Sequence, residues 1–218
     1  LFSYRVLKAF IKKEGIQLIH AQTRVTQFLA FLLSRRFDIA YVSTFHGFYR
    51  PHFLRKIMPC FGDLTIAVSQ AVGAHLANDF NLDKKNLRVI YNAVSPRPGS
   101  GTGRDYTLFK GNPTLGIVAR LSAEKGHILL FSVFKRLVND YPQARLLVVG
   151  SGRKGKELKH WAEKEKLTEK IIFLGDVVPL EPLLKILDLS ILPSVIEGLG
   201  FSILEAQAAG VPVIATRV

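Results

Sequence analysis

Short apolar runs alternate with amphipathic helical patterns along the whole 218-residue chain. Apolar runs bounded by turn residues predict buried strands, and the helical periodicity between them predicts covering helices. The predicted strands are residues 16–20, 39–45, 64–68, 87–91, 114–119, 145–149, 171–174, 189–192 and 211–215. The predicted helices are residues 2–13, 23–34, 69–80, 126–141, 154–166, 180–186 and 200–209. This alternation is typical of α/β domains in which helices cover both faces of a parallel sheet.

Residues 95–103 interrupt the alternation with two prolines, three glycines and two serines, a composition typical of a linker. We therefore predict two doubly wound domains, residues 1–103 with the linker and residues 104–218. Each is expected to bind its ligand at the carboxyl ends of its strands. The chain starts at Leu1 within a helical pattern and ends at Val218 just after a predicted strand, so we expect both domains to be incomplete.

Composition and charge narrow the function classes. Apolar residues make up 48% of the chain and charged residues 22%, which is typical of a globular protein rather than a disordered one. Cys60 is the single cysteine, so a disulfide scaffold is excluded and a reducing compartment, the cytoplasm, is expected. The net charge is +13, and residues 1–108 hold fifteen basic and six acidic side chains. Such a field attracts nucleic acid, anionic lipid or phosphorylated small molecules.

A glycine-rich run follows the strand at 145–149. Residues 150–155 fit the pattern G-x-G-x-x-G and precede a predicted helix, and Asp176 follows the next strand. Glycines of this kind let the backbone approach a diphosphate at a helix N-terminus. The pattern fits a dinucleotide-dependent oxidoreductase, but also a plain strand-to-helix turn or another nucleotide contact.

Two acidic and two basic residues follow other predicted strands in the sequence. Glu197 opens a Glu-Gly-Leu-Gly-Phe run at the start of a predicted helix, and Glu205 follows eight positions later. Free N–H groups at such a helix start suit phosphate, and carboxylates accept hydrogen bonds from sugar hydroxyls. Arg120 and Lys125 follow the strand at 114–119 and suit phosphate as well. Taken singly, each of these side chains also fits an ordinary surface residue, and His46 fits a structural histidine.

Together these segments resemble a known family. The runs IVARLSAEKGHILLF, ARLLVVGSGR, IIFLGDV and DLSILPSVIEGLGFSILEAQAAGVPVIAT resemble the nucleotide-sugar domain of retaining family-4 glycosyltransferases of the GT-B fold. The runs IQLIHAQ, VSTFHGF, DLTIAVSQAV and VIYNAV resemble the acceptor domain of the same family. The resemblance implies two Rossmann-like domains that face a cleft. The chain departs from the family pattern at Gln22, which replaces a second histidine, and at Ala93, which replaces a glycine.

The resemblance also implies a role for each residue of these motifs. The implied catalytic residues are His46 and Glu197. The implied ligands of the donor diphosphate are Arg120, Lys125, Gly198, Leu199, Gly200 and Phe201. The implied ligands of the nucleotide are Gly150, Gly152 and Glu205.

The resulting hypothesis is a retaining hexosyltransferase of cell-envelope or lipopolysaccharide-type glycan synthesis. Its partners would be a nucleotide diphosphate sugar and a glycan or lipid-linked acceptor. No metal or other cofactor is expected, because the sequence lacks an Asp-x-Asp motif at a strand end and a basic pair can neutralise the diphosphate. The alternatives are the oxidoreductase and a non-catalytic basic module that binds membrane or nucleic acid. Nucleic acid is not expected, since no RNP strand or C-x2-C pair occurs.

Residues 48–58 predict a further partner, an anionic membrane surface. Aromatic and aliphatic side chains alternate there with Arg50, Arg55 and Lys56. Aromatic rings suit the headgroup level of a bilayer, and basic residues are attracted to anionic lipid. Peripheral binding at the inner face of the membrane is therefore expected, and the alternative is a solvated helix that packs on its own domain.

Overall fold

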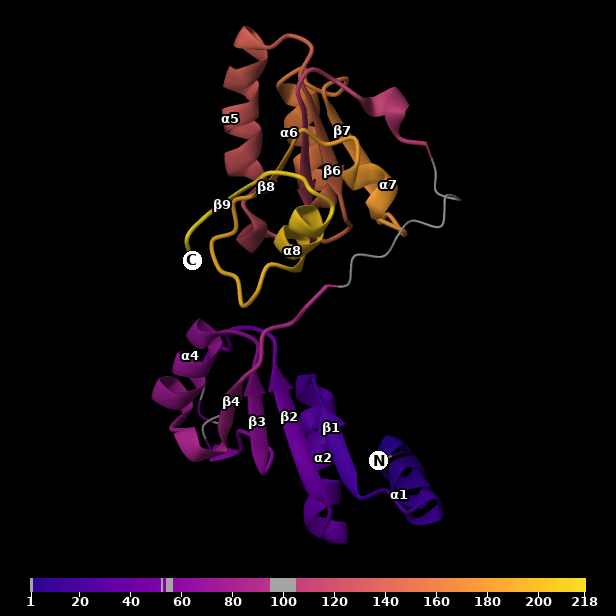
Figure 1. The fold of residues 1–218 in the computed structure, drawn as a ribbon, viewed down its shortest axis with the longest axis vertical. Helices are drawn as coiled ribbons and strands as arrows, with labels where there is room; N and C mark the ends of the chain where they lie inside the picture. Colours follow the sequence, from indigo (N-terminus) through magenta and orange to yellow (C-terminus); the bar gives the residue numbers. More distant parts are fainter. Residues whose placement is uncertain (1, 52, 54–56, 95–104) are drawn as a thin grey trace. The chain divides into compact units, whose positions relative to one another are not determined.

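The computed structural model describes residues 2–51, 53, 57–94 and 105–218. The chain forms two compact units, Leu1–Asn92 and Ala93–Val218 (Figure 1). The predicted linker at 95–103 lies outside the described residues, and so do residues 52 and 54–56 of the predicted membrane segment. Within the described ranges, no helix combines the length and the apolar character needed to cross a bilayer.

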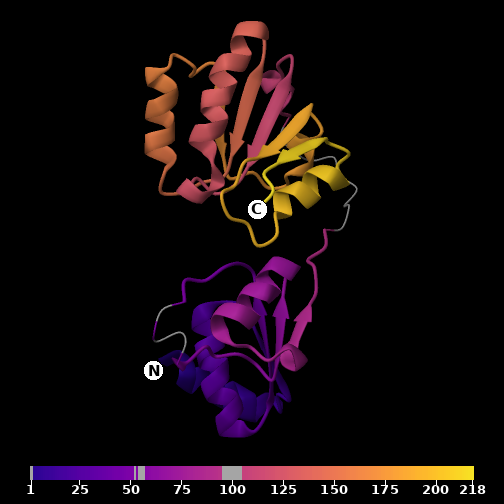
Figure 2. The same cartoon turned by 90° about the vertical axis from the view of Figure 1, so that its left-hand side faces the viewer.

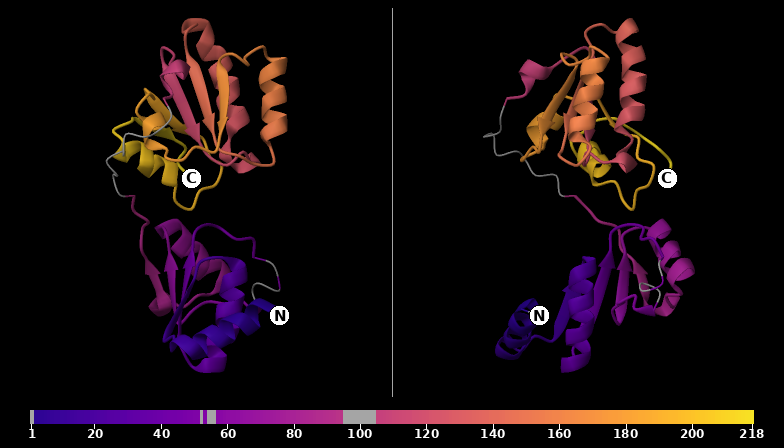
Figure 3. Two further views of the ribbon diagram at one scale, coloured as in Figure 1. Left: turned by 90° about the vertical axis from the view of Figure 1, so that its right-hand side faces the viewer. Right: turned by 180° about the vertical axis from the view of Figure 1, so that it is seen from behind.

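The first unit is built on a parallel sheet whose strand order follows the chain, β1-β2-β3-β4 (Figure 3). The strands are β1 (Leu18–Ala21), β2 (Ala40–Phe45), β3 (Leu64–Ala67) and β4 (Leu87–Val89). The helices are α1 (Phe2–Glu14), α2 (Arg24–Phe37), α4 (Gln70–Phe80) and the 3-10 turn η1 (Lys84–Asn86).

Polar side chains hold α2 on this sheet. The Thr23 side chain caps the helix by accepting a hydrogen bond from the amide of Thr26, and the Thr23 amide donates one to Thr26 Oγ1 in return. Gln27 is fully buried, and its Nε2 donates to the carbonyl of Thr44 on β2 at 3.1 Å. The hydroxyl of buried Tyr41 donates to the carbonyl of Cys60 at 2.9 Å. These bonds satisfy the Gln27 Nε2 and the Tyr41 hydroxyl, which burial would otherwise penalise.

The second unit is built on a five-stranded parallel sheet in the order β7-β6-β5-β8-β9. The strands are β5 (Thr114–Val118), β6 (Arg145–Val149), β7 (Ile171–Gly175), β8 (Leu189–Leu192) and β9 (Val213–Ala215). The helices are α5 (His127–Asp140), α6 (Gly155–Lys164), α7 (Glu181–Leu184) and α8 (Phe201–Ala208). The 3-10 turns are η2 (Thr107–Phe109) and η3 (Ala123–Lys125).

Both faces of this second sheet are covered by apolar side chains. Phe131 and Phe134 of α5 pack with Leu158 of α6 in one core, and Leu183 of α7 packs with Ala206 of α8 in the other. Figure 2 shows α5 and α6 on the opposite side of the sheet from α8. The chain leaves β5 toward β6 on one side and later returns to β8 on the other. The carboxyl ends of β5 and β8 therefore form a topological switch point, where open α/β sheets bind ligands.

The predicted α/β class with two parallel sheets is confirmed, and every predicted strand and helix has a counterpart in the structure. The differences lie at element ends. The strand predicted at 16–20 begins at Leu18, and the helix predicted at 180–186 is the single turn Glu181–Leu184. The 3-10 turns had no signal in the apolar periodicity, because three residues are too few to show one.

Candidate functional site

The loop after β5 packs closely against the loop after β8. Gly126 ends η3 with φ +70°, and a Cβ built there would lie 2.0 Å from the carbonyl oxygen of Pro193. The amide of Val195 donates to the carbonyl of Glu124 at 2.8 Å. Two loops whose residues Lys125 and Glu197 are 72 positions apart in sequence are thus held together by backbone contacts, and glycine is the residue that allows the approach.

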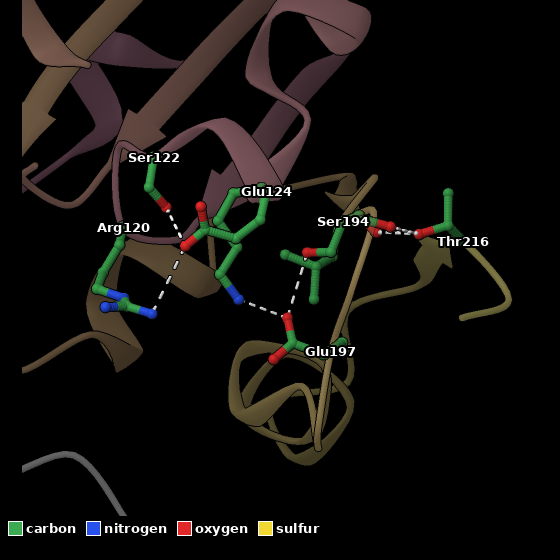
Figure 4. Close-up of polar contacts among 8 residues, drawn as sticks. Arg120, Ser122, Glu124, Ser194, Glu197 and Thr216 are labelled. Carbon is green, nitrogen blue, oxygen red and sulfur yellow. Dashed lines mark hydrogen bonds and ion pairs between the residues drawn. The ribbon is translucent and has the colours of Figure 1, made fainter. Parts of the chain in front are cut away.

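An ion pair bridges the same two loops (Figure 4). Lys125 Nζ lies 2.5 Å from Glu197 Oε2, and their side chains are only 14% and 19% exposed. Ser194 Oγ donates to the same carboxylate oxygen at 3.2 Å. Because water is largely excluded, loss of either partner would leave an uncompensated charge. The pair therefore fixes a cation and an anion side by side at the switch point.

Arg120 adds a second cation with more freedom. Its side chain is 79% exposed, and Nη2 lies 3.7 Å from Glu124 Oε1. Ser122 Oγ donates to Glu124 Oε1 at 2.7 Å, and this hydrogen bond is the main cause that lowers the pKa of Glu124 (Figure 4). An exposed pair of this length contributes little to stability. Arg120 is accordingly available for an incoming anion.

The N-terminus of α8 faces the same region without a side-chain cap. Gly200 occupies the N-cap position and offers no side chain, and the first turn contains no acidic residue. The positive end of the helix dipole is therefore not neutralised locally. Thr216 Oγ1 donates to the carbonyl of Ser194 at 2.5 Å and supports the loop that leads into the helix.

The glycine run after β6 packs on the loop after β5. Gly150 has φ +122°, and a Cβ there would lie 2.2 Å from the carbonyl oxygen of Ala119. A Cβ on Gly152 would lie 2.5 Å from the carbonyl oxygen of Leu121, whose amide donates to Ser151 O at 2.9 Å. These glycines thus serve packing between two loops, which accounts for the glycine pattern without a dinucleotide.

These loops enclose a cavity of about 540 Å³, within the range of ligand sites. Of the predicted site residues, eight line it: Arg120, Lys125, Gly150, Glu197, Leu199, Gly200, Phe201 and Glu205. Gly152 and Gly198 lie in the adjoining loops but are not among the lining residues. Burial raises the pKa of the Glu205 carboxyl.

Sequence reasoning missed several lining residues near the ends of β6 and β7 and the start of α8: Ser151, Asp176, Val177, Val178 and Ser202. Ser151 Oγ donates to Asp176 Oδ2 at 2.8 Å, and Val178 is 93% exposed. The sequence pattern predicts Asp176 only as the acid of a dinucleotide site. Its position after a strand was the signal that could have placed it here, since β7 and β6 are neighbours.

His46 lies in the first unit, after β2. Its Nε2 is 3.1 Å from Gln22 Oε1, and nearby His20 Nε2 is 2.7 Å from Thr44 Oγ1. Burial lowers the pKa of His46, and the proximity of His20 lowers it further. In the described ranges, no group of three His, Cys, Asp or Glu side chains is placed to hold a metal ion.

Family comparison agrees with this arrangement of motifs. The sequence profile described as "Glycosyl transferases group 1" matches residues 103–218. The chain belongs to this family. A second profile, "Glycosyltransferase Family 4", matches residues 1–97. The chain is therefore a glycosyltransferase-family sequence over both units, and the resemblance predicted from its motifs is confirmed.

Individual relatives point the same way. An uncharacterized glycosyltransferase of Methanocaldococcus jannaschii is 26% identical, with 95% of this chain and 60% of that protein covered. The Vi polysaccharide biosynthesis protein VipC/TviE of Salmonella typhi is 30% identical, with 68% and 27% covered. The crystal structure of HepE from Anabaena, in complex with UDP and glucose, is 26% identical with a TM-score of 0.82. It is matched over 96% of this chain and 62% of that chain, so this chain spans under two thirds of these relatives.

Proposed function

We propose that the complete protein transfers a hexose-type sugar from a nucleotide diphosphate sugar to an acceptor hydroxyl, with retention of the anomeric configuration. The observation that carries the proposal is the cavity at the switch point of the second unit, where Lys125, Arg120 and the uncapped start of α8 meet two carboxylates. Such a combination of groups suits a ligand with a charged diphosphate centre and hydroxyl groups on either side, which supports the proposal. The UDP and glucose in the crystal structure of HepE have that chemistry.

The order of the strands suggests how the donor lies. Asp176 and Val178 follow β7, Gly150 follows β6, Lys125 follows β5 and Glu197 follows β8. We therefore place the nucleoside at the β7 side, the diphosphate at β5 and the sugar beside Glu197. Glu205 would accept hydrogen bonds from the ribose, because its carboxyl lines the same cavity from α8.

In the proposed reaction, the bond between the anomeric carbon and the diphosphate oxygen breaks while the acceptor oxygen bonds to the same carbon on the same face. The acceptor proton passes to the departing diphosphate. Lys125, Arg120 and the helix dipole stabilise the negative charge that develops on the leaving group. Since these groups supply positive charge, we propose that the reaction proceeds without a metal ion.

The acceptor would bind at the first unit, where His46 lies at the carboxyl end of β2. A glycan or lipid-linked acceptor of the cell envelope is proposed, in line with the polysaccharide role in the name of VipC/TviE. Phe53 and Ile57 are 76% and 65% exposed, which supports peripheral contact with an anionic membrane from the cytoplasmic side. Arg55 and Lys56 of this segment lie outside the described residues. Sedimentation with anionic vesicles at low and high salt tests this part.

Thermal unfolding of the complete protein with UDP-, GDP- and ADP-sugars tests the donor assignment. A ligand that binds only the native state stabilises it by about 2.7 kcal/mol at a hundredfold excess over Kd. At least one nucleotide sugar should raise the Tm, and NADH should not. Stabilisation by NADH with no response to any nucleotide sugar would favour the oxidoreductase and overturn the proposal.

A further inference from the structure

Gln22 and His46 meet at the carboxyl edge of the first sheet. β1 and β2 are parallel neighbours, with His20 opposite Val42 and Ala21 opposite Ser43. The residues just beyond both strands therefore emerge on the same edge. His46 Nε2 lies 3.1 Å from Gln22 Oε1 across this edge. The two side chains come from elements 24 residues apart, so the contact depends on the strand pairing.

The chemistry of this contact determines which ring nitrogen carries the proton. With Gln22 Oε1 facing the ring, the amide oxygen is the acceptor, and the His46 tautomer that matches this contact carries its proton on Nε2 and donates. In the neutral ring the lone pair then lies on Nδ1. The contact thus favours one tautomer of His46, with Nδ1 left as a hydrogen-bond acceptor.

The neighbouring groups favour the neutral ring. His20 is the titratable side chain whose charge acts on His46, and His20 is itself bonded to Thr44 Oγ1 at 2.7 Å. A charge on His20 repels a charge on His46, and partial burial disfavours the imidazolium as well. Gln22 is uncharged, so it orients the ring without favouring protonation, whereas a carboxylate at this position would stabilise the imidazolium.

We propose that Gln22 is a positioning residue for His46, which it holds as the Nε2-protonated tautomer so that Nδ1 accepts a hydrogen bond from a substrate hydroxyl. The proposal rests on the proposed function, because the hydroxyl belongs to a substrate of the sugar transfer. Gln22 itself touches no reacting atom and acts through the imidazole. Position 22 thereby gains a role that its departure from the two-histidine pattern did not suggest.

The test combines imidazole ¹⁵N NMR with kinetics on the complete protein and the variants Gln22→Ala and Gln22→Glu. In Gln22→Ala, we expect Nδ1-protonated His46 to appear and kcat to fall roughly fivefold, since one hydrogen bond contributes about 1 kcal/mol. Donor affinity should not change. In Gln22→Glu, the pKa of His46 should rise, and the acidic limb of the kcat profile should move to higher pH.

Thr44→Val supplies the matched control, because it removes the partner of the other histidine and nearly keeps the shape of the side chain. It should change the signals of His20 and leave the tautomer of His46 as it is. The proposal is overturned if Gln22→Ala leaves the tautomer unchanged, or if the tautomer changes while kcat does not. If the protein turned over no nucleotide sugar, the proposed function would fall, and the NMR measurements would still decide whether Gln22 sets the protonation of His46.

Discussion

Both sheets are built from parallel strands, but they differ in strand order and in the contacts that hold the loops at their carboxyl ends. In the second unit, the strand order reverses at β5 and the loops around the switch point are held by the Lys125–Glu197 pair and by close glycine contacts. In the described part of the first unit, the strand order simply follows the chain. The hollow described beside Phe45 and Tyr49 measures about 10 Å³, room for about one water.

The two units therefore differ in how their candidate functional residues are held in place. Backbone contacts fix the loops of the second unit before any ligand arrives, which lowers the cost of binding. In the first unit, His20 and His46 each depend on a single side-chain hydrogen bond, part-buried for His20 and exposed for His46. The second unit is therefore expected to be sensitive to backbone and charge substitutions, and the first to changes of individual hydrogen-bond partners.

The largest expected effect comes from Gly150→Ala. The new Cβ would meet the carbonyl oxygen of Ala119 at 2.2 Å, in a backbone with φ +122°. Backbone strain and overpacking each cost about 1–3 kcal/mol, so the second unit should lose roughly 2–6 kcal/mol. Urea unfolding followed by the fluorescence of Trp161, the single tryptophan of the chain, measures this loss.

Gly47→Ala in the first unit is the matched substitution, since a Cβ there meets nothing within 4 Å. Calorimetry should find a change of about 0.5 kcal/mol or less. Equal losses in the two glycine variants would contradict the difference in loop packing between the units.

The next effect is a loss of stability of the second unit in acid. His127 is 2% exposed, and burial, followed by the charge of Lys125, lowers its pKa to about 4. The unfolded chain has a histidine pKa of about 6.5, so it binds a proton in this interval that the folded protein does not. The contribution of the neutral His127 to the free energy of unfolding is complete above pH 6.5. It is lost as the pH falls toward 4, by up to about 3 kcal/mol.

His127→Leu removes this titration, so its stability should fall less steeply between pH 6.5 and pH 4 than that of the unsubstituted protein. Trp161 fluorescence again provides the measurement, because Trp161 packs on Phe131 in the core beside α5. Parallel pH profiles for the two proteins would show that His127 does not remain neutral in the folded state.

Sequence alone placed the charged motifs next to strand ends, but it did not show which side chains they contact. Arg120 and Lys125, like Glu197 and Glu205, stand at fixed spacings next to predicted strands, so local pattern was sufficient. The pairing of Lys125 with Glu197 joins residues 72 positions apart and depends on β5 and β8 being neighbours. Strand order is a property of the whole sheet, and apolar periodicity carries no information about it.

The lack of information on strand order also explains why the sequence did not reveal the packing role of Gly150 or the contact between Gln22 and His46. A sequence pattern cannot distinguish a glycine that admits a phosphate from one that admits a carbonyl group, and Gly150 admits Ala119 O. Gln22 looked like the loss of a histidine, because its contact with His46 requires the register of β1 and β2. What sequence could not predict is thus concentrated in contacts between strand ends.

Lys125→Ala is expected to have a smaller effect, a loss of binding free energy to the diphosphate that is measured as a lower kcat/KM. A charge-assisted hydrogen bond to the diphosphate contributes roughly 1.5–3 kcal/mol, so kcat/KM should fall about ten- to hundredfold. Lys135→Ala is the control, because Lys135 also pairs with a glutamate, Glu165, but does not line the cavity. Full activity of Lys125→Ala, or an equal loss in both variants, would contradict the placement of the diphosphate.

The smallest expected effect is that of metal removal. Lys125 and Arg120 bring two positive charges to the cavity, and the uncapped N-terminus of α8 adds a dipole equivalent to roughly half a charge. These fixed groups can offset the charge of a departing diphosphate, as a divalent cation does in other transferases. Initial rates of the complete protein should therefore agree within about twofold before and after dialysis against EDTA. A tenfold loss that added Mg²⁺ or Mn²⁺ restores would show that the loops of the second unit do not supply enough charge by themselves.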